Sequence, residues 1–484
     1  MISGFGIAVA VVGLALMTMP ISWSLVLFVV LAPFRTAMAL SPPGMGGASV
    51  LVPHFFLIFF GLRVIRRLGH GPILAALLPP SAGFLLFLLV AYGLAGGIFY
   101  PRLMAGITDT IALQRHPDGG AAIVLVPLQT GGTYATQGIY ALGGLFAFGA
   151  SFAFFRTKGA LEHLLTALIA VCTVNVALAI LDLVTHATGT AQWLGFMRNA
   201  SYAILTDSEK GGLKRIVGSF SEASAFAVFT LALFAVACSL WLDATVAKRR
   251  SLLLALALLA LLLASTSGTA YVGLILVLTF LLLRHLARRL SGHRSVGLVP
   301  VLCVVLATAV ISLAIVVLAP SATTEIGTFL NETVFDKAVS QSGQERSMWN
   351  ATAFKNAVDT YGLGVGIGGA RASSYALVLL SNVGVPGFLL YLAFIGRLLF
   401  ATPSSALSPR EGSIVRAAQA GIVGFLAGHV LVGTVFDQGP IFYALAGAVA
   451  ASAFAPVSRA APAGRMQPSA EGLAVLDVQH GSAR

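Results

Sequence analysis

FSEASAFAVFTLALFAVACSLW, residues 220–241, is an apolar run with one carboxylate near its start and no other charged residue. About 20 consecutive apolar residues are enough to cross a bilayer as a helix. Runs of the same kind recur along the whole chain, separated by short basic clusters or by longer polar segments. The pattern predicts an all-α, polytopic helical membrane protein.

The composition of the 484 residues agrees with this class. Hydrophobic residues make up 58% and charged residues 10% of the chain, whereas soluble globular domains carry about 25% charged residues. These values exclude a secreted disulfide scaffold, a coiled coil, a disordered chain and an ordinary soluble enzyme. The three cysteines fall in apolar runs, where a thiol packs as a small hydrophobe, and no CxxC metal site or disulfide framework is expected.

Allowing about 20 residues for each span predicts about twelve transmembrane helices. The expected spans are 4–32, 48–62, 74–100, 139–155, 161–184, 220–241, 252–264, 271–283, 296–318, 373–400, 413–435 and 441–454. They form one membrane domain over 1–456, and the Ala-, Pro-, Gly- and Ser-rich residues 457–484 are expected to form a disordered cytoplasmic tail. The N-terminus lacks the basic region of a signal peptide, so the first span is expected to remain as an anchor.

The net charge of +12 comes mostly from short basic clusters between apolar runs. This is the pattern of cytoplasmic loops, and it does not indicate nucleic-acid binding. With the N-terminus in the cytoplasm, four long stretches fall on the outer side: 33–47, 101–138, 185–219 and 319–372. The last is a large loop between the ninth and tenth spans. A break at Met19 and Pro20 would split the first span and invert this orientation, but the basic clusters argue against it.

Charged residues gather where the third outer stretch meets the sixth span. Lys210, Lys214 and Arg215 end the stretch, and Glu222 follows Arg215 by about two turns if the segment is helical. Ionisable groups at the bilayer surface are functional candidates. Glu222 also has an equally good structural explanation, because Ser219 and Glu222 have the S-x-x-E spacing of a capping box.

The large loop contains a segment with helical spacing. Arg346 opens it, and Trp349, Ala353, Ala357 and Tyr361 follow at intervals that place them on one face. The pattern predicts an amphipathic helix at the membrane interface. Trp349 is a candidate for contacting substrate, although anchoring at headgroup level is the commoner role of such a tryptophan.

A run of glycines follows this helix and ends at Arg371. The glycines are Gly362, Gly364, Gly366, Gly368 and Gly369. Without side chains, their backbone amides are able to approach a phosphate closely. A flexible connection into the tenth span is the alternative. A dinucleotide fold is not indicated, because the run has no preceding strand and no βαβ unit around it.

The folded loops are expected to bring Arg215, Arg346 and Arg371 together at the outer bilayer surface. Guanidinium groups bind phosphate oxygens bidentately and stay charged at any relevant pH, which suits a lipid diphosphate. Each arginine taken singly is as well explained by a structural position at the interface.

Other polar residues rank lower as candidates. His54, His429 and Asp182 lie within or near spans. On one continuous helix His429 would be about 12 Å from Asp437, too far for a direct contact. The carboxylates of the triplet 207–209 are a weak candidate for a divalent ion, and neither a metal site nor a cofactor is expected.

The chain resembles the bacterial O-antigen ligase/polymerase family of polytopic glycosyltransferases, which act on polyprenyl-diphosphate-linked glycans. The matching segments, in chain order, are RIVGSFSEASAFA (215–227), SGQERSMWNATAFKNAVDTYGLGVGIGG (342–369) and YALVLLSNVGVPGFLLYL (375–392). The resemblance implies a largely helical fold of the inverting GT-C type, which uses no nucleotide sugar. It also implies a site on the periplasmic face of the bacterial inner membrane.

On this resemblance, Arg215 and Arg346 stand where the family holds the lipid pyrophosphate, and Glu222 stands at an acidic position of polymerase-like members. Two departures matter. Residues 265–269, STSGT, lack an arginine that often follows the serine there, and residues 371–374 replace a His-Asn pair common in ligases. The missing His-Asn pair argues against a histidine-assisted ligase mechanism and favours a polymerase-like member.

The expected function is therefore polymerisation of lipid-linked repeat units into surface polysaccharide or exopolysaccharide, without a metal. Arg215, Arg346 and Glu222 are the expected catalytic residues, and the expected substrate-binding residues are Arg371, Lys214, Gly364, Gly366 and Trp349. The alternatives are a ligase acting on lipid A core or another acceptor, a transporter or flippase for lipid-linked glycan, and a noncatalytic assembly subunit. Expected partners are the lipid-linked glycan, membrane lipids, and a chain-length regulator and flippase of the same pathway.

Overall fold

The computed structural model describes residues 2–41, 49–115, 121–201, 204–206, 209–210, 213–243, 247–292 and 341–454. The expected ninth span, 296–318, the first part of the large loop and the tail at 457–484 lie outside the described residues.

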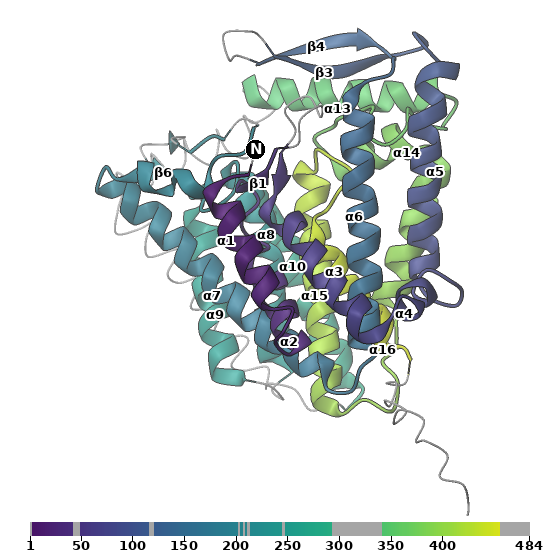
Figure 1. The fold of residues 1–484 in the computed structure, drawn as a ribbon. Helices are drawn as coiled ribbons and strands as arrows, with labels where there is room; N and C mark the ends of the chain where they lie inside the picture. Colours follow the sequence, from purple (N-terminus) through teal and green to yellow (C-terminus); the bar gives the residue numbers. More distant parts are fainter. Residues whose placement is uncertain are drawn as a thin grey trace, which may run out of the picture.

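The described chain is mostly helical, with short strand pairs at one end (Figure 1). Its helices are α1 (Gly4–Ala15), α2 (Ile21–Val30), α3 (Val52–Leu68), α4 (Gly71–Ala75), α5 (Gly83–Leu103), α6 (Gly132–Phe155), α7 (Ala160–Ala187), a 3-10 helix η1 (Ala191–Met197), α8 (Ala223–Leu242), α9 (Lys248–Ala264), α10 (Gly268–Leu290), α13 (Gln341–Asp359), α14 (Tyr375–Leu399), α15 (Pro409–Val432) and α16 (Pro440–Ser452). Its strands are β1 (Met38–Leu40), β2 (Val50–Leu51), β3 (Asp109–Arg115), β4 (Ala121–Pro127), β5 (Glu209–Lys210) and β6 (Leu213–Lys214). The strands pair as antiparallel hairpins, β1 with β2, β3 with β4 and β5 with β6. The sequence predicted helices alone, so these hairpins are an addition to the expected fold.

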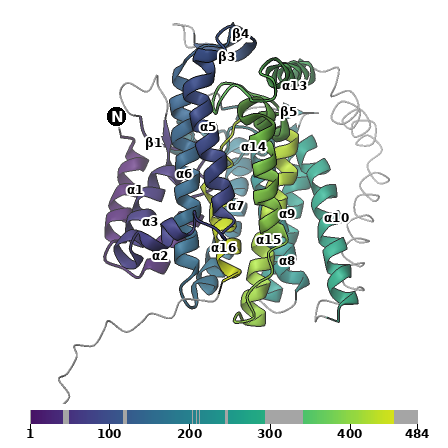
Figure 2. The same cartoon turned by 90° about the vertical axis from the view of Figure 1, so that its right-hand side faces the viewer.

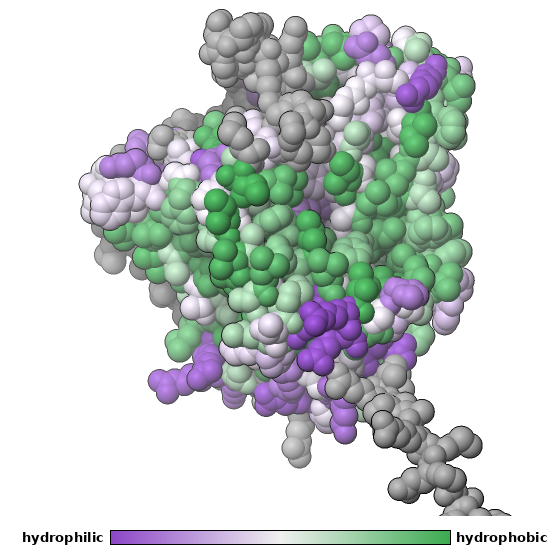
Figure 3. All heavy atoms as spheres, viewed as in Figure 1, coloured by the Kyte–Doolittle hydropathy of each residue, from purple (hydrophilic) through white to green (hydrophobic). Residues whose placement is uncertain are grey.

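Seven helices of the described part are long and apolar enough to cross a membrane: α5, α6, α7, α8, α10, α14 and α15. Three further apolar helices, α1, α2 and α16, are shorter. Hydrophobic side chains cover the flank of the bundle in Figure 3, and hydrophilic ones gather at its lower end. The chain is thus a mostly helical, multi-pass membrane protein, and the predicted count of about twelve spans is not confirmed.

The two ends of the bundle differ in character. At one end, here called the basic end, Arg66 and Arg67 lie in the last turn of α3, and Arg288 and Arg289 lie in the last turn of α10. At the other, here called the loop end, α13 and the β3–β4 hairpin lie across the tops of the long helices (Figures 1 and 2). The described parts of the long loops gather at the loop end, as the sequence predicted.

The first apolar run is a pair of short helices and not the single span that the sequence predicted. Pro20 has no amide hydrogen with which to continue α1, and α2 begins after it. The amide of Ser3 donates to Ala39 O at 3.0 Å, so the start of α1 and the segment after α2 lie at the same end. The N-terminus is therefore at the loop end, whereas it was expected opposite the 33–47 stretch. The direction of α3 and the later helices is not inverted, because the pair returns the chain to that end.

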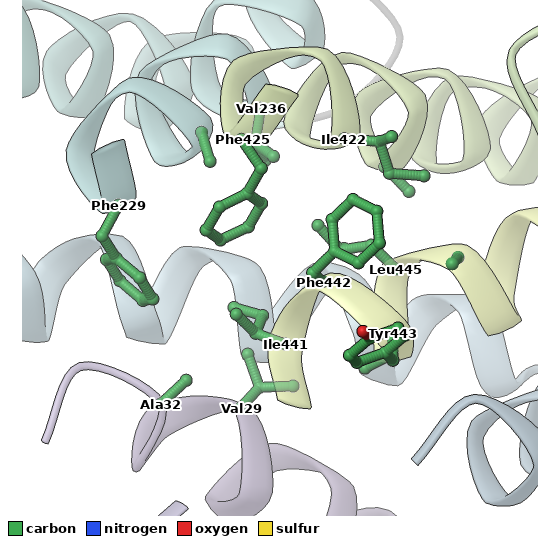
Figure 4. Packing of buried hydrophobic residues seen from close by; sticks show 14 of the residues in the cluster. Val29, Ala32, Phe229, Val236, Ile422, Phe425, Ile441, Phe442, Tyr443 and Leu445 are labelled. Atoms are coloured by element: carbon green, nitrogen blue, oxygen red, sulfur yellow. The ribbon is translucent and has the colours of Figure 1, made fainter. Parts of the chain in front are cut away.

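The helix α8 is the centre of the bundle. Nearly all of its side chains are buried, and Gly424 of α15 approaches it so closely that a methyl group there would meet Ala232 Cα at 2.6 Å. The Phe425 ring lies 5.9 Å from the Phe229 ring and 6.1 Å from the Phe442 ring of α16 (Figure 4). Small residues allow such close approach in a membrane, where lipid supplies little hydrophobic force between helices. This packing fixes the loop-end start of α8.

The helix α14 bends sharply at Gly384, where φ is +60° and ψ is −166°. The rings of Tyr375 and Tyr391 are 5.4 Å apart, although a straight helix would separate their backbones by about 24 Å. Pro386 follows the bend and removes one further helical hydrogen bond. The expected tenth span, 373–400, is thus continuous in sequence but not in direction, and α14 packs against α13.

Candidate functional site

Asp182 of α7 holds the segment that leads into α8. Its Oδ2 accepts hydrogen bonds from the amides of Val217 and Gly218 at 2.8 and 2.9 Å. Its Oδ1 lies 2.6 Å from Arg198 Nη2 and 3.8 Å from Lys214 Nζ. The carboxylate is almost fully buried. Asp182 therefore holds the segment before α8 in place. Lys214, which was expected to bind substrate, forms an ion pair with Asp182 instead.

The segment before α8 is also joined to the loop after α2. Thr36 Oγ1 donates to Ser219 O at 3.1 Å, and Ser219 Oγ donates to Pro33 O at 2.8 Å. Because the Ser219 hydroxyl is used in this way, the capping box suggested by the sequence does not form. Glu222 is itself the N-cap of α8 without a side-chain capping bond, and it accepts a hydrogen bond from Ser224 Oγ. The capping-box explanation of Glu222 is therefore wrong.

Glu222 and Arg346 each lie within electrostatic reach of Arg215. Burial lowers the pKa of Arg215, the Glu222 carboxylate raises it, and the Arg346 guanidinium lowers it. Tyr271, near the start of α10, also acts on Arg215. The Arg215 Nε is buried and has no hydrogen-bond partner among the described residues. Segments far apart in the sequence thus place two cations and a carboxylate together at the loop end.

Asparagine side chains fix the position of α13, which carries Arg346. Asn356 Nδ2 donates to Thr108 Oγ1 at 3.0 Å and to Asp109 O at 2.6 Å, where β3 begins. Asn350 Oδ1 accepts a hydrogen bond from the amide of Ser373 at 2.8 Å. The predicted helix in this segment is confirmed by α13. The β3–β4 hairpin, which the sequence did not indicate, supports it from the other side.

Trp349 lies on the inward face of α13. Ala353 and Ala357 are buried on the same face, whereas Tyr361 lies beyond the helix with φ of +55° and is exposed. The indole Nε1 of Trp349 is buried without a hydrogen-bond partner among the described residues. A buried donor without an acceptor is unfavourable by about 1–3 kcal/mol, so a ligand oxygen would be favoured at this position.

The glycines after α13 pack against backbone and do not present amides to a ligand. Gly364 and Gly366 have φ of +83° and +87°, and a methyl group at Gly366 would meet Gly97 Cα at 2.4 Å. The Gly364 amide donates to Thr360 Oγ1 at 3.0 Å, and the Gly366 amide donates to Asn382 O at 2.8 Å. The amides of Gly364 and Gly366 are therefore already hydrogen-bonded within the protein and do not make the expected phosphate contact. The glycines instead allow close packing against α5 and α14.

Arg371 follows the glycine segment and precedes α14. Burial alone lowers its pKa, and Arg371 is not among the charges that act on Arg215. Within the described ranges, no hydrogen bond or ion pair of Arg371 is formed. The electrostatic grouping of Arg215 with Arg346 is therefore shown, and the membership of Arg371 in the expected group of three arginines stays a prediction.

A second polar cluster lies where α3, α6 and the loop after α15 meet. His54 Nε2 is 3.2 Å from Asp437 Oδ2, with side chains 10% and 7% exposed. The His54 Nδ1 and Asp437 Oδ1 atoms are buried and have no partner in the described part of the chain. The Tyr140 ring stands edge-on to His54, with centroids 4.6 Å apart. Because α15 ends at Val432, Asp437 is not on one helix with His429, and the sequence-based separation of these residues does not apply.

His429 and Gln438 extend the second cluster toward α14. Gln438 Nε2 is 3.5 Å from His429 Nδ1, and Gln438 Oε1 accepts a hydrogen bond from Tyr391 OH at 2.9 Å. The Arg35 guanidinium lies over Gly439, where a methyl group would be 3.4 Å from Arg35 Cζ. Arg35 belongs to the loop that is hydrogen-bonded to the start of α8. The two polar clusters are therefore connected through that loop.

A pocket of about 260 Å³ opens between α3 and α6 beside His54. Its walls are mostly apolar and include Ile58, Ile139 and Phe146, and Ser49 and Thr136 add polar groups. Ile58 and Ile139 are also exposed on the flank of the bundle. The pocket is therefore suited to a hydrocarbon chain that enters from the membrane side.

No protein-family model, curated protein or solved structure matches this chain. Among the residues that the structure describes, no group of three or more His, Cys, Asp and Glu side chains is placed to hold a metal ion. Asp207, one of the carboxylates considered from the sequence, lies outside the described residues.

The loop-end group has a defined chemical capacity. Arg215 and Arg346 with Glu222 carry a net positive charge, which suits the oxygens of a phosphate or diphosphate. The Glu222 carboxylate in the same group is suited to accept a proton from a bound hydroxyl.

Proposed function

We propose that the chain polymerises polyprenyl-diphosphate-linked oligosaccharide repeat units into surface polysaccharide or exopolysaccharide. The reaction is an inverting glycosyl transfer at the periplasmic face of a bacterial inner membrane. The observation that carries the proposal is the grouping of Arg215, Arg346 and Glu222 at the loop end of an apolar bundle. The resemblance of residues 215–227 and 342–369 to the O-antigen ligase/polymerase family supports the same function.

The arginine pair binds the diphosphate of the donor. Arg215 is half-buried and its Nε has no acceptor among the described residues, so a phosphate oxygen completes its hydrogen bonding. Two guanidinium groups neutralise the negative charge that grows on the leaving diphosphate. Partial burial strengthens this attraction, because the local dielectric constant is lower than that of water.

Bond making and breaking follow from this binding mode. A hydroxyl of the acceptor repeat unit attacks the anomeric carbon of the donor from the side opposite the diphosphate, so the configuration is inverted. The carbon–oxygen bond to the diphosphate breaks, and polyprenyl diphosphate leaves with the electron pair. The hydroxyl proton passes to Glu222, a contribution of about 10²- to 10⁴-fold for a well-placed base.

Arg346→Ala tests the proposal directly. With lipid-linked repeat units supplied to isolated membranes, we expect polymer formation to fall at least about 10²-fold, because one of two charges on the leaving group is removed. Arg102→Ala is the matched control, since Arg102 is an exposed arginine at the same end of the bundle, in the last turn of α5. Normal chain lengths from Arg346→Ala membranes that contain normal amounts of protein would contradict the proposal.

The alternatives predict different products. A ligase would bind the donor diphosphate with the same arginine pair and transfer the glycan to lipid A core or another acceptor. Supplying the purified protein with a lipid-linked repeat unit and with lipid A core, and identifying which acceptor is extended, separates polymerase from ligase. A transporter or flippase would move lipid-linked glycan without a new glycosidic bond. Polymer formed in detergent, where there is no membrane to cross, would therefore exclude transport as the sole activity.

A further inference from the structure

The basic end of the bundle contains an arginine cluster that glycosyl transfer at the loop end does not use. Asp243 is the C-cap of α8, Arg284 and Arg288 lie in the last turns of α10, and Arg416 lies near the start of α15. The three helices pack against one another, and these ends lie at the bottom of the bundle in Figure 2. We refer to these four residues as the basic-end cluster.

The single carboxylate of the basic-end cluster forms ion pairs with two of its arginines. Asp243 Oδ2 is 2.6 Å from Arg416 Nε, and Asp243 Oδ1 is 3.4 Å from Arg288 Nε. Arg284 Nη1 donates instead to the Arg416 carbonyl oxygen at 2.9 Å. Arg284 is within electrostatic range of Asp243, Arg288 and Arg416 but touches no carboxylate among the described residues. Three guanidinium groups therefore share one counter-ion.

Hydrogen-bond donors in this cluster also remain without acceptors. Arg284 Nη2 is buried and has no partner in the described part of the chain. The neighbouring His285 is 4% exposed, and its Nε2 is likewise buried without a described partner. The Arg288 and Arg416 side chains are 20% and 19% exposed, so the cluster is open to the surface.

We propose that the basic-end cluster binds the phosphate of an anionic phospholipid headgroup, with Arg284 and Arg288 as its main ligands. Phosphate oxygens match the N–H groups of guanidinium in pairs. Anionic headgroups concentrate at the membrane surface, and basic pockets between transmembrane helix ends are suited to bind them. The lipid supplies the negative charge that Asp243 alone does not.

A purely structural role accounts for only part of this cluster. Arg288 and Arg416 tie α10 and α15 to α8 through the two oxygens of Asp243. Arg284 adds a third positive charge that is not needed for these two ion pairs. Its guanidinium lies 5.8 Å from the Phe280 ring centroid. The excess positive charge, the unpaired hydrogen-bond donors and the exposure of the cluster at the surface together indicate an anion-binding site.

The test uses the full-length chain purified in neutral detergent and titrated with phosphatidylglycerol or phosphatidylcholine, with bound lipid counted by native mass spectrometry. We expect tighter binding of phosphatidylglycerol, and a loss of about tenfold in Arg284→Gln, the size expected for one charged hydrogen bond. Arg410→Gln is the matched control, because Arg410 pairs with Glu162 at 2.7 Å on an exposed surface of the basic end. The control is expected to bind phosphatidylglycerol as the wild type does.

Equal affinity of the wild type and Arg284→Gln, or an equal loss in Arg410→Gln, would overturn the proposal. If Arg284→Gln does not fold, Arg284→Lys decides the question: it keeps the charge and loses the planar fork, so a loss of about threefold supports the site and no loss rejects it. Inorganic phosphate distinguishes the source of the ligand. Displacement of phosphatidylglycerol by equimolar inorganic phosphate would show that free phosphate is the ligand and would overturn the lipid assignment.

Discussion

Glu222 is the N-cap of the central helix α8, and its side chain makes no capping bond there. Its described contacts are with Ser224 and, electrostatically, with Arg215. A carboxylate at a helix start stabilises the helix through a hydrogen bond to the backbone, which the Glu222 side chain does not make, or through the helix dipole. Its electrostatic interaction with Arg215 supports the proposed role as proton acceptor.

Substituting Glu222→Gln separates these roles. Glutamine keeps the size of the side chain and removes the proton acceptor, so we expect the polymerisation rate at saturating donor to fall by about 10²-fold or more. Donor binding should be unchanged or tighter, because a negative charge near the diphosphate is lost. Rates measured against donor concentration, with Glu162→Gln as an exposed control, check this. A fully active Glu222→Gln enzyme would reduce Glu222 to a structural residue.

Individual residues differed in how much the sequence revealed about them. Arg215, Glu222 and Arg346 were identified because charges at a membrane surface are uncommon and carry their own signal. Asp182 gave the same signal, but its partners Val217 and Gly218 contribute backbone amides, which no sequence pattern marks. Pairs such as His54 with Asp437 form only when distant segments fold together, so the sequence did not reveal them.

At the scale of elements, apolar runs and helical spacing predicted most of the described helices, including α13. Hydropathy measures composition and not direction, which is why the bend at Gly384 in α14 was missed. The break between α1 and α2 was considered at Pro20 but rejected because of the basic clusters. Pro20 and Pro386 were visible signals of both breaks. The β3–β4 hairpin was missed because its strands lie in a long stretch expected to be a loop between spans, and the apolar run of β4 is too short to cross a membrane.

The glycine segment after α13 yields a prediction about packing. Gly366→Ala would place a methyl group 2.4 Å from Gly97 Cα and hold a non-glycine residue at φ of +87°. We expect a loss of about 1–3 kcal/mol or more in stability, seen as a lower melting temperature in detergent. Gly396→Ala in α14 is the control, because no atom lies within 4 Å of a methyl group there. Equal melting temperatures for both variants and the wild type would mean that the segment is not packed in this way.

At the scale of the whole molecule, the two ends of the bundle carry different charged sites. The loop end joins Arg215, Arg346 and Glu222 from loops that are separate in the sequence, and Asp182 and Asn356 hold those loops in place. The basic end gathers arginines around one carboxylate. The apolar flank lies between them (Figure 3), and in the proposed function the lipid chain of the substrate lies along it while the diphosphate binds the arginine pair.

The central claim is that Arg215 and Arg346 act together on one diphosphate. A double-mutant cycle measures this directly, with binding of polyprenyl diphosphate to the purified wild type, Arg215→Ala, Arg346→Ala and the double variant. We predict that each single change weakens binding by about tenfold or more and that the double change adds little, a coupling of about 1 kcal/mol or more. Strictly additive losses, or single variants that bind as the wild type does, would contradict the account.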